Sequence, residues 1–402
     1  MGATLATVAS LCKEIYEPRL RKQLNDDAVT IKRVTRSSEG IETNVGGRYV
    51  TFPIKTRRNA GIGARNEMEA LPVPGQQGYN AARVGLKYLY GGIRLSGQTI
   101  ELVNTNPQAF ISALESEVDG LKTDLAKDQN RQVYGDGSGA IAVAGTLTAG
   151  TNTFLAKDAM YAQSGMQIDI IDGTTLGNPN PTVKASNRQI TGINVSTNVI
   201  TFDGAVVSTA VGDIVVRTGN VNREWTGFTK IFKTTGSLYN IDPATEPIWA
   251  AVVDSNSGVN RPLSEGLMIA LADSIRTNGG KTTAIFSNLG VRRAYFNLLV
   301  QQRQYTNTKD FGGGFTGLTF TTDKGEIPVA VDVDAPKNTL FFANEDELTV
   351  YRQADWEFMD RDGSMWNRVA GYDAYEAIMY QYSELGCHRR NTQGILADIT
   401  EG

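Results

Sequence analysis

The chain has 402 residues, of which 41% are hydrophobic and 20% charged, and its formal net charge at pH 7 is -4. This composition predicts a folded protein of one to three domains and argues against a basic nucleic-acid binder or a disordered chain. No apolar run reaches the roughly 18 residues that a membrane-spanning helix needs. The first ten residues lack the charged start and apolar block of a secretory signal, so we expect a cytosolic protein.

Histidine and cysteine are too scarce for most metal and nucleophile chemistry. Cys12, Cys387 and His388 are the whole supply, so a zinc site with four such ligands cannot form. A serine hydrolase would have to use His388, and we keep it as the third-ranked functional hypothesis. We interpret Cys387 as a small buried hydrophobe and predict neither a metal nor a cofactor.

The first 40 residues predict an arm. A short apolar stripe from Leu5 to Ile15 precedes a charged tail, and a helix this short needs other surface to pack against. Alternating apolar residues then predict two strands, at 48–55 and 83–95, with Val84, Leu86, Tyr88 and Tyr90 on one face of the second. The pair Gly91-Gly92 predicts a bulge.

The connection between these strands is polar, glycine-rich and far longer than an ordinary hairpin loop. It has no core of its own, so we expect it to contact a partner through its charges. The candidate contact residues in it are Arg57, Arg58, Arg65, Glu67 and Glu69.

The clearest helix in the sequence follows. Asn106 is a good N-cap, Pro107 suits the first helical position, and apolar residues from Phe110 to Leu125 share one stripe before Gly135 ends it. The other face is net acidic and complements the basic connection, although the pattern alone favours a solvated face, as in most long helices. Its candidate contact residues are Glu115, Glu117 and Asp119.

A charge-poor region rich in Thr, Val, Ile and Asn runs from 141 to about 220. Short strands are predicted at 167–171, 189–195, 199–202 and 213–218, separated by turns such as Asp172-Gly173 and Asp203-Gly204. The spacing predicts an inserted β subdomain that is a small barrel or sandwich.

From residue 240 the pattern is that of packed helices and strands. Helices are predicted at 262–277 and 290–301, and strands at 283–286, 317–321, 327–333, 339–343 and 348–351. An aromatic-rich segment at 372–385 is predicted to return and pair with an earlier one.

Three motifs fit simple turns and loops better than chemistry. Residues 312–317 match G-x-G-x-x-G, but Thr-rich β sequence follows where a helix would have to begin. Residues 360–363 start like a calcium loop without the later ligands. Asp332 and Asp334 would serve as an acid pair, yet the turn after them predicts an exposed strand end.

The order of these elements resembles the major capsid proteins of tailed bacteriophages, whose fold encapsulins and herpesvirus capsid floors share. Local phrases that resemble this family are 325–329 (Gly-Glu-Ile-Pro-Val), 338–344 (Asn-Thr-Leu-Phe-Phe-Ala-Asn) and 382–387 (Tyr-Ser-Glu-Leu-Gly-Cys). The resemblance implies an α+β phage capsid fold. Its parts would be an N-arm at 1–40, an extended loop at 41–103, a spine helix with the start of the peripheral domain at 104–140, an inserted β subdomain at 141–221, an axial domain at 222–350, and a peripheral strand with axial tail at 351–402.

The function implied by the resemblance is structural. Pentamers and hexamers would close into an icosahedral shell in the host cytoplasm and enclose double-stranded DNA without specific binding. Portal, scaffold or decoration proteins would be further partners. Lys55 or Lys87 would supply the lysine of a family crosslink, but no glutamate and asparagine match by motif, so we expect a noncovalent shell. An encapsulin-like cage around a cargo enzyme is the alternative, and a β-rich adhesin explains less of the chain.

Overall fold

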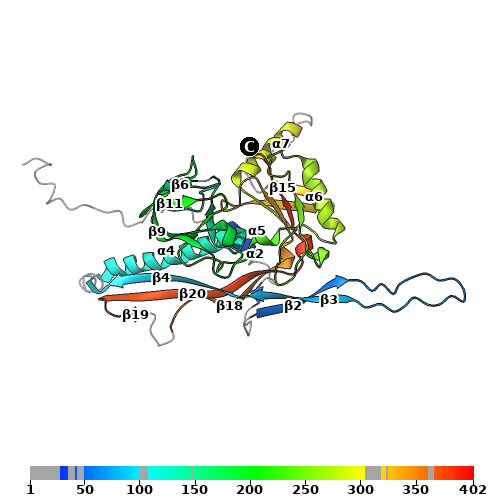
Figure 1. Cartoon of the computed structure of the whole chain (residues 1–402), viewed down its shortest axis with the longest axis horizontal. Helices are drawn as coiled ribbons and strands as arrows, with labels where there is room; N and C mark the ends of the chain where they lie inside the picture. Colours follow the sequence, from blue (N-terminus) through cyan, green and yellow to red (C-terminus); the bar gives the residue numbers. More distant parts are fainter. Residues whose placement is uncertain are drawn as a thin grey trace, which may run out of the picture.

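The computed structural model describes residues 28–34, 41–42, 49–98, 107–146, 148–303, 318–322, 325–360 and 366–402, and Figure 1 shows their arrangement. Most of the predicted arm, the glycine loop at 312–317 and residues 361–363 of the predicted turn lie outside these ranges. Among the described residues, no helix is long and apolar enough to cross a membrane.

A long sheet and a long helix form the base of the molecule. The strands in order are β1 (Ile41–Glu42), β18 (Leu348–Phe358), β20 (Ala374–Cys387) and β19 (Asn367–Arg368), and β4 (Lys87–Ser96) also pairs with β20. Helix α4 (Pro107–Tyr134) lies along one face of this sheet (Figure 1), and its bounds confirm the helix predicted from the sequence. The returning segment predicted at 372–385 is β20, which pairs antiparallel with both β18 and β4.

A two-stranded hairpin extends from the base, away from the rest of the molecule (Figure 1). It consists of β2 (Tyr49–Arg57) and β3 (Gly78–Gly85), which pair antiparallel. The single strand predicted at 83–95 is wrong, because the chain leaves β3 at Leu86 and begins β4 at Lys87. The buried alternation changes phase there. Val84 and Leu86 are buried, whereas Tyr88 and Tyr90 of β4 are exposed.

The bulge predicted at Gly91-Gly92 is also wrong, because β4 and β20 keep one register through both glycines. Gly91 instead lets α4 approach the sheet. A Cβ atom at Gly91 would lie 2.8 Å from a methyl carbon of Leu125 and 3.0 Å from one of Leu121. The absence of a side chain thus serves packing between the helix and the sheet.

The charge-poor region forms a small closed sheet. Its strands in order are β5 (Ala140–Val143), β12 (Ile214–Arg217), β8 (Gln167–Ile171), β9 (Val183–Asn194), β10 (Val199–Phe202) and β7 (Thr153–Leu155). The bridge from Ala144 to Ala156 joins the two ends of this order, which closes the strands into a barrel around Phe154 and Phe202. A short pair, β6 (Thr148–Thr151) and β11 (Val207–Thr209), lies beside it. The four strands predicted here are confirmed within a few residues.

The third unit packs helices on a mixed sheet. The strands in order are β13 (Val252–Asp254), β21 (Gly394–Leu396), β17 (Leu340–Ala343), β14 (Ala284–Ser287), β16 (Gly325–Val331) and β15 (Leu318–Thr322), with helices α6 (Glu265–Thr277) and α7 (Leu289–Arg303). Ser264 caps α6 by accepting a hydrogen bond from the Leu267 amide. The helices predicted at 262–277 and 290–301 are confirmed.

One apolar core joins the third unit to the base. It contains residues of α2 (Val29–Val34), the end of α4, the short helix α5 (Phe228–Ile231) and strands of both sheets. Arg390 is fully buried at its edge, where it donates to the carbonyl oxygens of Ile231, Lys230 and two residues of the following turn. Four carbonyl acceptors compensate for removing this guanidinium from water.

Candidate assembly surfaces

The hairpin tip, residues 58–77, projects away from the body (Figure 1). It carries exposed apolar side chains. Four of them are at least 83% exposed: Ile62, Met68, Leu71 and Val73. Exposed apolar groups gathered on one projecting element mark an interaction site, because a monomer gains nothing from holding them in water. A prediction from the charges of this segment misses these residues. The sequence signal that could have identified them is a group of apolar residues that follow neither strand nor helix periodicity and lie in a segment without a core of its own.

The tip has a shape that its own polar groups fix. The Arg65 guanidinium donates to the carbonyl oxygens of Ala70 and Ala64, both at 2.9 Å. Glu69 accepts from the backbone and side-chain nitrogens of Asn66, each at 3.0 Å, and these bonds lower the pKa of Glu69. The two arms also lie close together, since a Cβ atom at Gly61 would be 2.5 Å from the Gly75 nitrogen. The exposed apolar groups are therefore presented on a folded loop.

The predicted charged residues of the hairpin divide into three groups. Arg57 lies 3.6 Å from Glu246 of the same subunit, and this ion pair connects the hairpin to the body. Arg65 and Glu69 hold the tip together. Arg58 and Glu67 are exposed, and neither has a hydrogen-bond or ion-pair partner among the described residues. These two residues are therefore the best placed of the predicted set to contact a neighbouring subunit.

The acidic face of α4 is open at the helix's N-terminal half. Glu117 and Asp119 are exposed, and Asp119 has Lys122 at 4.0 Å. The Glu115 side chain lies outside the described residues. Figure 1 places this half of α4 and the hairpin tip at opposite ends of the molecule. Contacts between the two sets can therefore form only between different subunits, and they stay a prediction.

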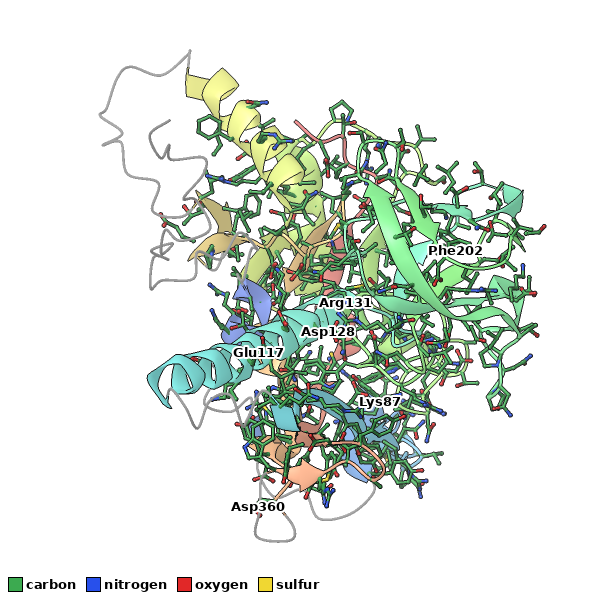
Figure 2. All side chains as sticks on the ribbon, turned by 90° about the vertical axis from the view of Figure 1, so that its left-hand side faces the viewer. Lys87, Glu117, Asp128, Arg131, Phe202 and Asp360 are labelled. Atoms are coloured by element: carbon green, nitrogen blue, oxygen red, sulfur yellow. The ribbon has the colours of Figure 1, made fainter. Side chains whose placement is uncertain are left out.

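The last six residues of α4, 129–134, are buried, and the charged group among them is paired within the subunit. Arg131 donates to both carboxylate oxygens of Glu224 at 2.7 Å and to Asp128 at 3.1 Å. Burial opposes ionisation of Asp128, but the charges of Arg131 and Arg217 outweigh it and lower the pKa of this carboxyl. Figure 2 shows Glu117 on the open part of α4 and Arg131 nearer the body.

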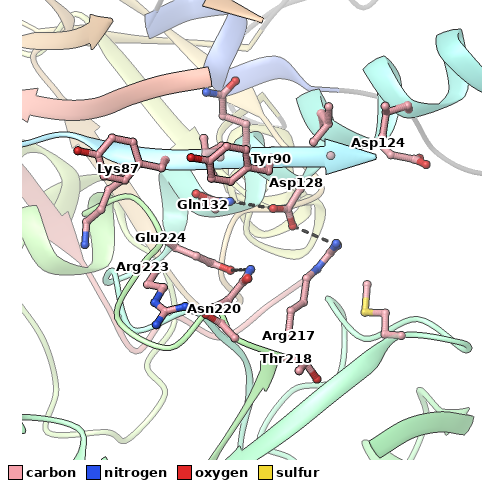
Figure 3. Close-up of a pocket in the computed structure, with 18 of the residues that line it drawn as sticks. Lys87, Tyr90, Asp124, Asp128, Gln132, Arg217, Thr218, Asn220, Arg223 and Glu224 are labelled. Atoms are coloured by element: carbon pink, nitrogen blue, oxygen red, sulfur yellow. Dashed lines mark hydrogen bonds and ion pairs between the residues drawn. The ribbon is translucent and has the colours of Figure 1, made fainter. Parts of the chain in front are cut away.

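A groove of about 870 Å³ runs between α4, β4 and the segment 217–224 (Figure 3). Charged side chains that line the groove have their partners within the same subunit. Asp128 binds Gln132 and Arg217, Glu224 binds Asn220, and the Lys87 ammonium donates to the Asn222 carbonyl at 2.9 Å. Among the described residues, no three Asp, Glu, His or Cys side chains form a group that would hold a metal ion.

The Asp332–Asp334 pair is buried, so the predicted exposed strand end is wrong. Asp332 accepts from the Thr30 amide and hydroxyl at 3.0 and 2.7 Å, and its exposed fraction is 1%. Asn130 of α4 donates to both carboxylates, and Lys127 lies 2.9 Å from Asp334. Burial raises the pKa of Asp334. Both carboxylate oxygens of Asp332 and Oδ2 of Asp334 accept bonds that fasten α2 and α4 to the third unit, which is a structural role.

His388 faces aromatic side chains. Its Nε2 lies 2.7 Å from the Tyr351 hydroxyl, and its ring meets the Phe52 ring edge to face. The thiol of neighbouring Cys387 is fully buried, and burial raises its pKa to about 12, so this cysteine is a poor nucleophile. The prediction of Cys387 as a buried hydrophobe is confirmed. Neither residue has the activated nucleophile and base pairing that a hydrolase needs.

Comparison with solved structures defines the fold. A chain of the Cyanophage A-1(L) capsid asymmetric unit matches with a TM-score of 0.60 at 14% identity, covering 99% of this chain and 100% of that chain. Capsid chains of the empty and native GTA particles match with TM-scores of 0.54 and 0.52 at 8% and 10% identity, over at least 99% of both chains. The protein therefore has the phage capsid fold that the sequence resemblance implied.

Family comparison then identifies the protein's class more closely. The model of the SU10 major capsid protein family matches residues 186–399, more than half of the chain. The chain belongs to this family and is a major capsid protein. No curated protein matches it.

Proposed function

We propose that copies of this chain self-assemble as pentamers and hexamers into an icosahedral shell that encloses the double-stranded DNA of a tailed phage. The role is structural and not catalytic. The hairpin tip is the observation that supports it most, because a folded loop with four exposed apolar side chains has no use in an isolated subunit. A neighbouring subunit would cover those side chains.

Apolar burial at the tip would provide more binding free energy than the charges. Full burial of one Ile, Leu, Met or Val side chain contributes about 1.5–3 kcal/mol. An exposed ion pair contributes up to about 1 kcal/mol and weakens in salt. We therefore assign the main attraction to the apolar tip and the choice of register to the charges around it.

The charge pairs that we propose join Arg57, Arg58 or Arg65 of one subunit to the acidic face of α4 in the next. Arg58 is the best candidate, since Arg57 and Arg65 already have acceptors within their own subunit. Glu117 and Asp119 are the exposed acceptors on α4. Glu115, Glu67 and Glu69 complete the proposed contact set.

The genome would be enclosed without specific binding. The chain carries 39 basic and 43 acidic residues, so a subunit has no charge excess that would neutralise phosphates. An acidic inner wall would leave packed DNA mobile. A strongly basic inner face in the assembled shell would contradict this part of the proposal.

The division of the chain and its other partners remain proposals. The separate sheets of the barrel and of the third unit support treating 141–221 and 222–350 as distinct domains, with 1–40, 41–103, 104–140 and 351–402 forming the arm, loop, spine and returning strand. Assembly would take place in the host cytoplasm, aided by portal, scaffold or decoration proteins. A cage around a cargo enzyme would share the fold, but the family match favours a viral capsid.

The test is assembly of the purified protein, followed by negative-stain electron microscopy and sedimentation. The wild type should give closed shells or rings of five and six subunits. A double variant, Ile62→Ser with Leu71→Ser, should remain as free subunits with an unchanged melting temperature.

The matched control is Val195→Ser, which makes the same kind of change at a side chain that is 65% exposed on the barrel. It should assemble like the wild type. If the wild type and the double variant assemble equally well, the tip is not the assembly contact. If the wild type stays monomeric even when co-expressed with its neighbouring genes, the shell proposal fails.

A further inference from the structure

The chain has a single histidine, and it lies at the root of the extended hairpin. The His388 ring packs edge to face on Phe52 of β2, with ring centres 4.9 Å apart and planes at 84°. Its Nε2 is hydrogen-bonded to the hydroxyl of Tyr351 in β18 at 2.7 Å. Its backbone nitrogen donates to the Glu347 carbonyl at 2.9 Å. One half-buried imidazole thus joins the hairpin to the long sheet.

A tight turn around Tyr239 also contacts the root of the hairpin. Tyr239 packs against Phe52 with ring centres 6.5 Å apart, and its hydroxyl donates to the Leu385 carbonyl at 2.7 Å. Its own carbonyl accepts from the Arg83 amide of β3 at 3.0 Å. Tyr239 holds the left-handed backbone angle φ of 53°, which a non-glycine residue adopts only where the surroundings enforce it. Phe52 therefore contacts two rings, His388 and Tyr239, each of which is hydrogen-bonded to the body.

These contacts set the direction in which the long hairpin extends from the body. The hairpin runs on from Phe52 to the apolar tip near Met68, a reach of roughly 50 Å for an extended chain at about 3.3 Å per residue. A rotation of about 10° at the root would move the tip by roughly 9 Å over that reach. Beyond the root, the Arg57 side chain that forms the salt bridge to Glu246 is 73% exposed, so this pair restrains the hairpin weakly.

We propose that His388 is a positioning residue that sets the angle of the hairpin and, through it, the angle between neighbouring subunits in the shell. This inference rests on the proposed assembly through the hairpin tip. The hydrogen bond between the Tyr351 hydroxyl and Nε2 of His388 fixes the rotation of the imidazole, and the imidazole edge then fixes the Phe52 ring. A loose joint would let the tip reach neighbours at several angles and would give shells of several curvatures.

Three variants separate the two contributions of the imidazole. Tyr351→Phe removes only the hydroxyl hydrogen bond. His388→Phe keeps a ring against Phe52 but loses the bond, and His388→Gln keeps a polar atom for Tyr351 but loses the ring. Tyr295→Phe is the matched control, because the Tyr295 hydroxyl donates to the Thr319 carbonyl at 2.9 Å, away from the hairpin.

The first measurement is amide hydrogen exchange on unassembled subunits, so it does not depend on shell formation. Exchange in peptides covering 49–57 and 78–85 should be three- to tenfold faster in all three variants, which is the size expected for one lost hydrogen bond. The control should match the wild type there. Selective ¹⁵N labelling of histidine gives one imidazole, whose signals should move in Tyr351→Phe and stay in Tyr295→Phe.

The second measurement is the distribution of particle diameters after assembly. The wild type and Tyr295→Phe should give one narrow distribution, and Tyr351→Phe should give a broader one at a melting temperature within a few degrees of the control. Hairpin exchange and diameters equal to those of Tyr295→Phe in all variants would overturn the proposal. Faster exchange with unchanged diameters would show that the joint holds the hairpin without deciding curvature, which also overturns it.

Discussion

Two regions of the molecule, the buried end of α4 and the hairpin tip, treat their side chains in opposite ways. At the buried end of α4, charged groups that prefer water are enclosed, and each has partners within the subunit, as Arg131 has in Glu224 and Asp128. At the hairpin tip, apolar groups that avoid water are left in it, as Ile62 and Leu71 are. The first arrangement is complete in one chain. The second is complete only when another chain covers it.

This contrast separates folding from assembly. Changes at the buried end should lower the stability of the free subunit, because they leave unpaired charge or empty space. Changes at the tip should leave the subunit's stability intact and alter only association. Four experiments test this separation, in order of the expected effect.

The largest effect is expected for Arg131→Met. The substitution leaves the Glu224 carboxylate buried with Asn220 as its one remaining hydrogen-bond donor among the described residues. Removing one partner of a buried ion pair costs about 3–5 kcal/mol of unfolding free energy. Urea unfolding of the free subunit measures it. Lys122→Met, on the exposed half of α4, is the control and should cost less than about 1 kcal/mol.

The next effect is a pH dependence from Glu384, which is fully buried in β20. Desolvation raises the pKa of this carboxyl to about 8, against an ordinary value of 4.5. Between these two values the folded state keeps a proton that the unfolded state has released, so stability should fall as pH rises from about 4.5 to about 8. The slope from this group is on the order of 1.4 kcal/mol per pH unit at most.

Glu384→Gln tests that slope, since an amide can still accept from the Thr226 and Leu385 nitrogens that the carboxylate binds. Melting temperatures measured from pH 5 to pH 9 should decline less in this variant than in the wild type. Glu117→Gln changes an exposed carboxylate and should keep the wild-type decline. Equal slopes in all three proteins would show that Glu384 is ionised in the folded subunit.

A smaller effect is expected when the tip keeps its apolar groups but loses its shape. Arg65→Ala removes the two hydrogen bonds to Ala64 and Ala70 and leaves Ile62, Met68, Leu71 and Val73 in place. The concentration needed for assembly should rise by about tenfold, the equivalent of one or two weak hydrogen bonds per contact. Light scattering against protein concentration measures it. A loss of subunit stability above about 1 kcal/mol would contradict the separation.

The smallest effect is expected for charge at the contact. Arg58→Glu should raise the concentration needed for assembly by about fivefold at low salt, and the difference should vanish near 1 M salt, where charges are screened within about 3 Å. Glu117→Arg in the same chain should restore assembly if these residues meet. Additive defects in the double variant would show that Arg58 contacts another surface.

Several features of the fold followed from local patterns. The bounds of α4 follow from a cap, a first-turn proline and a terminal glycine, and the strands at 167–171 and 199–202 follow from β-rich runs between turns. These signals act over one or two turns of chain, so they can be recognised without knowing which segments pack together. The order of elements along the chain also carried the resemblance to phage capsid proteins.

The candidate contact set was harder to predict because charge alone does not tell what a side chain touches. Arg65 and Glu69 form hydrogen bonds within the tip. Arg57 lies near Glu246, which is far away in sequence. Asp332 follows a strand and reads as exposed, yet Thr30 and Asn130 arrive from distant segments to bury it. No local pattern encodes such partners.

The sequence by itself determined the elements, the capsid resemblance and the scarcity of catalytic groups. Tertiary structure decided which face each element buries: the phase change at Leu86, the close packing of α4 on Gly91 and the meeting of His388 with Phe52. The physical reason is that periodicity is set by neighbours along the chain, whereas burial and pairing are set by whatever chain segment arrives in space. At the hairpin tip, the covering segment that we propose belongs to another subunit.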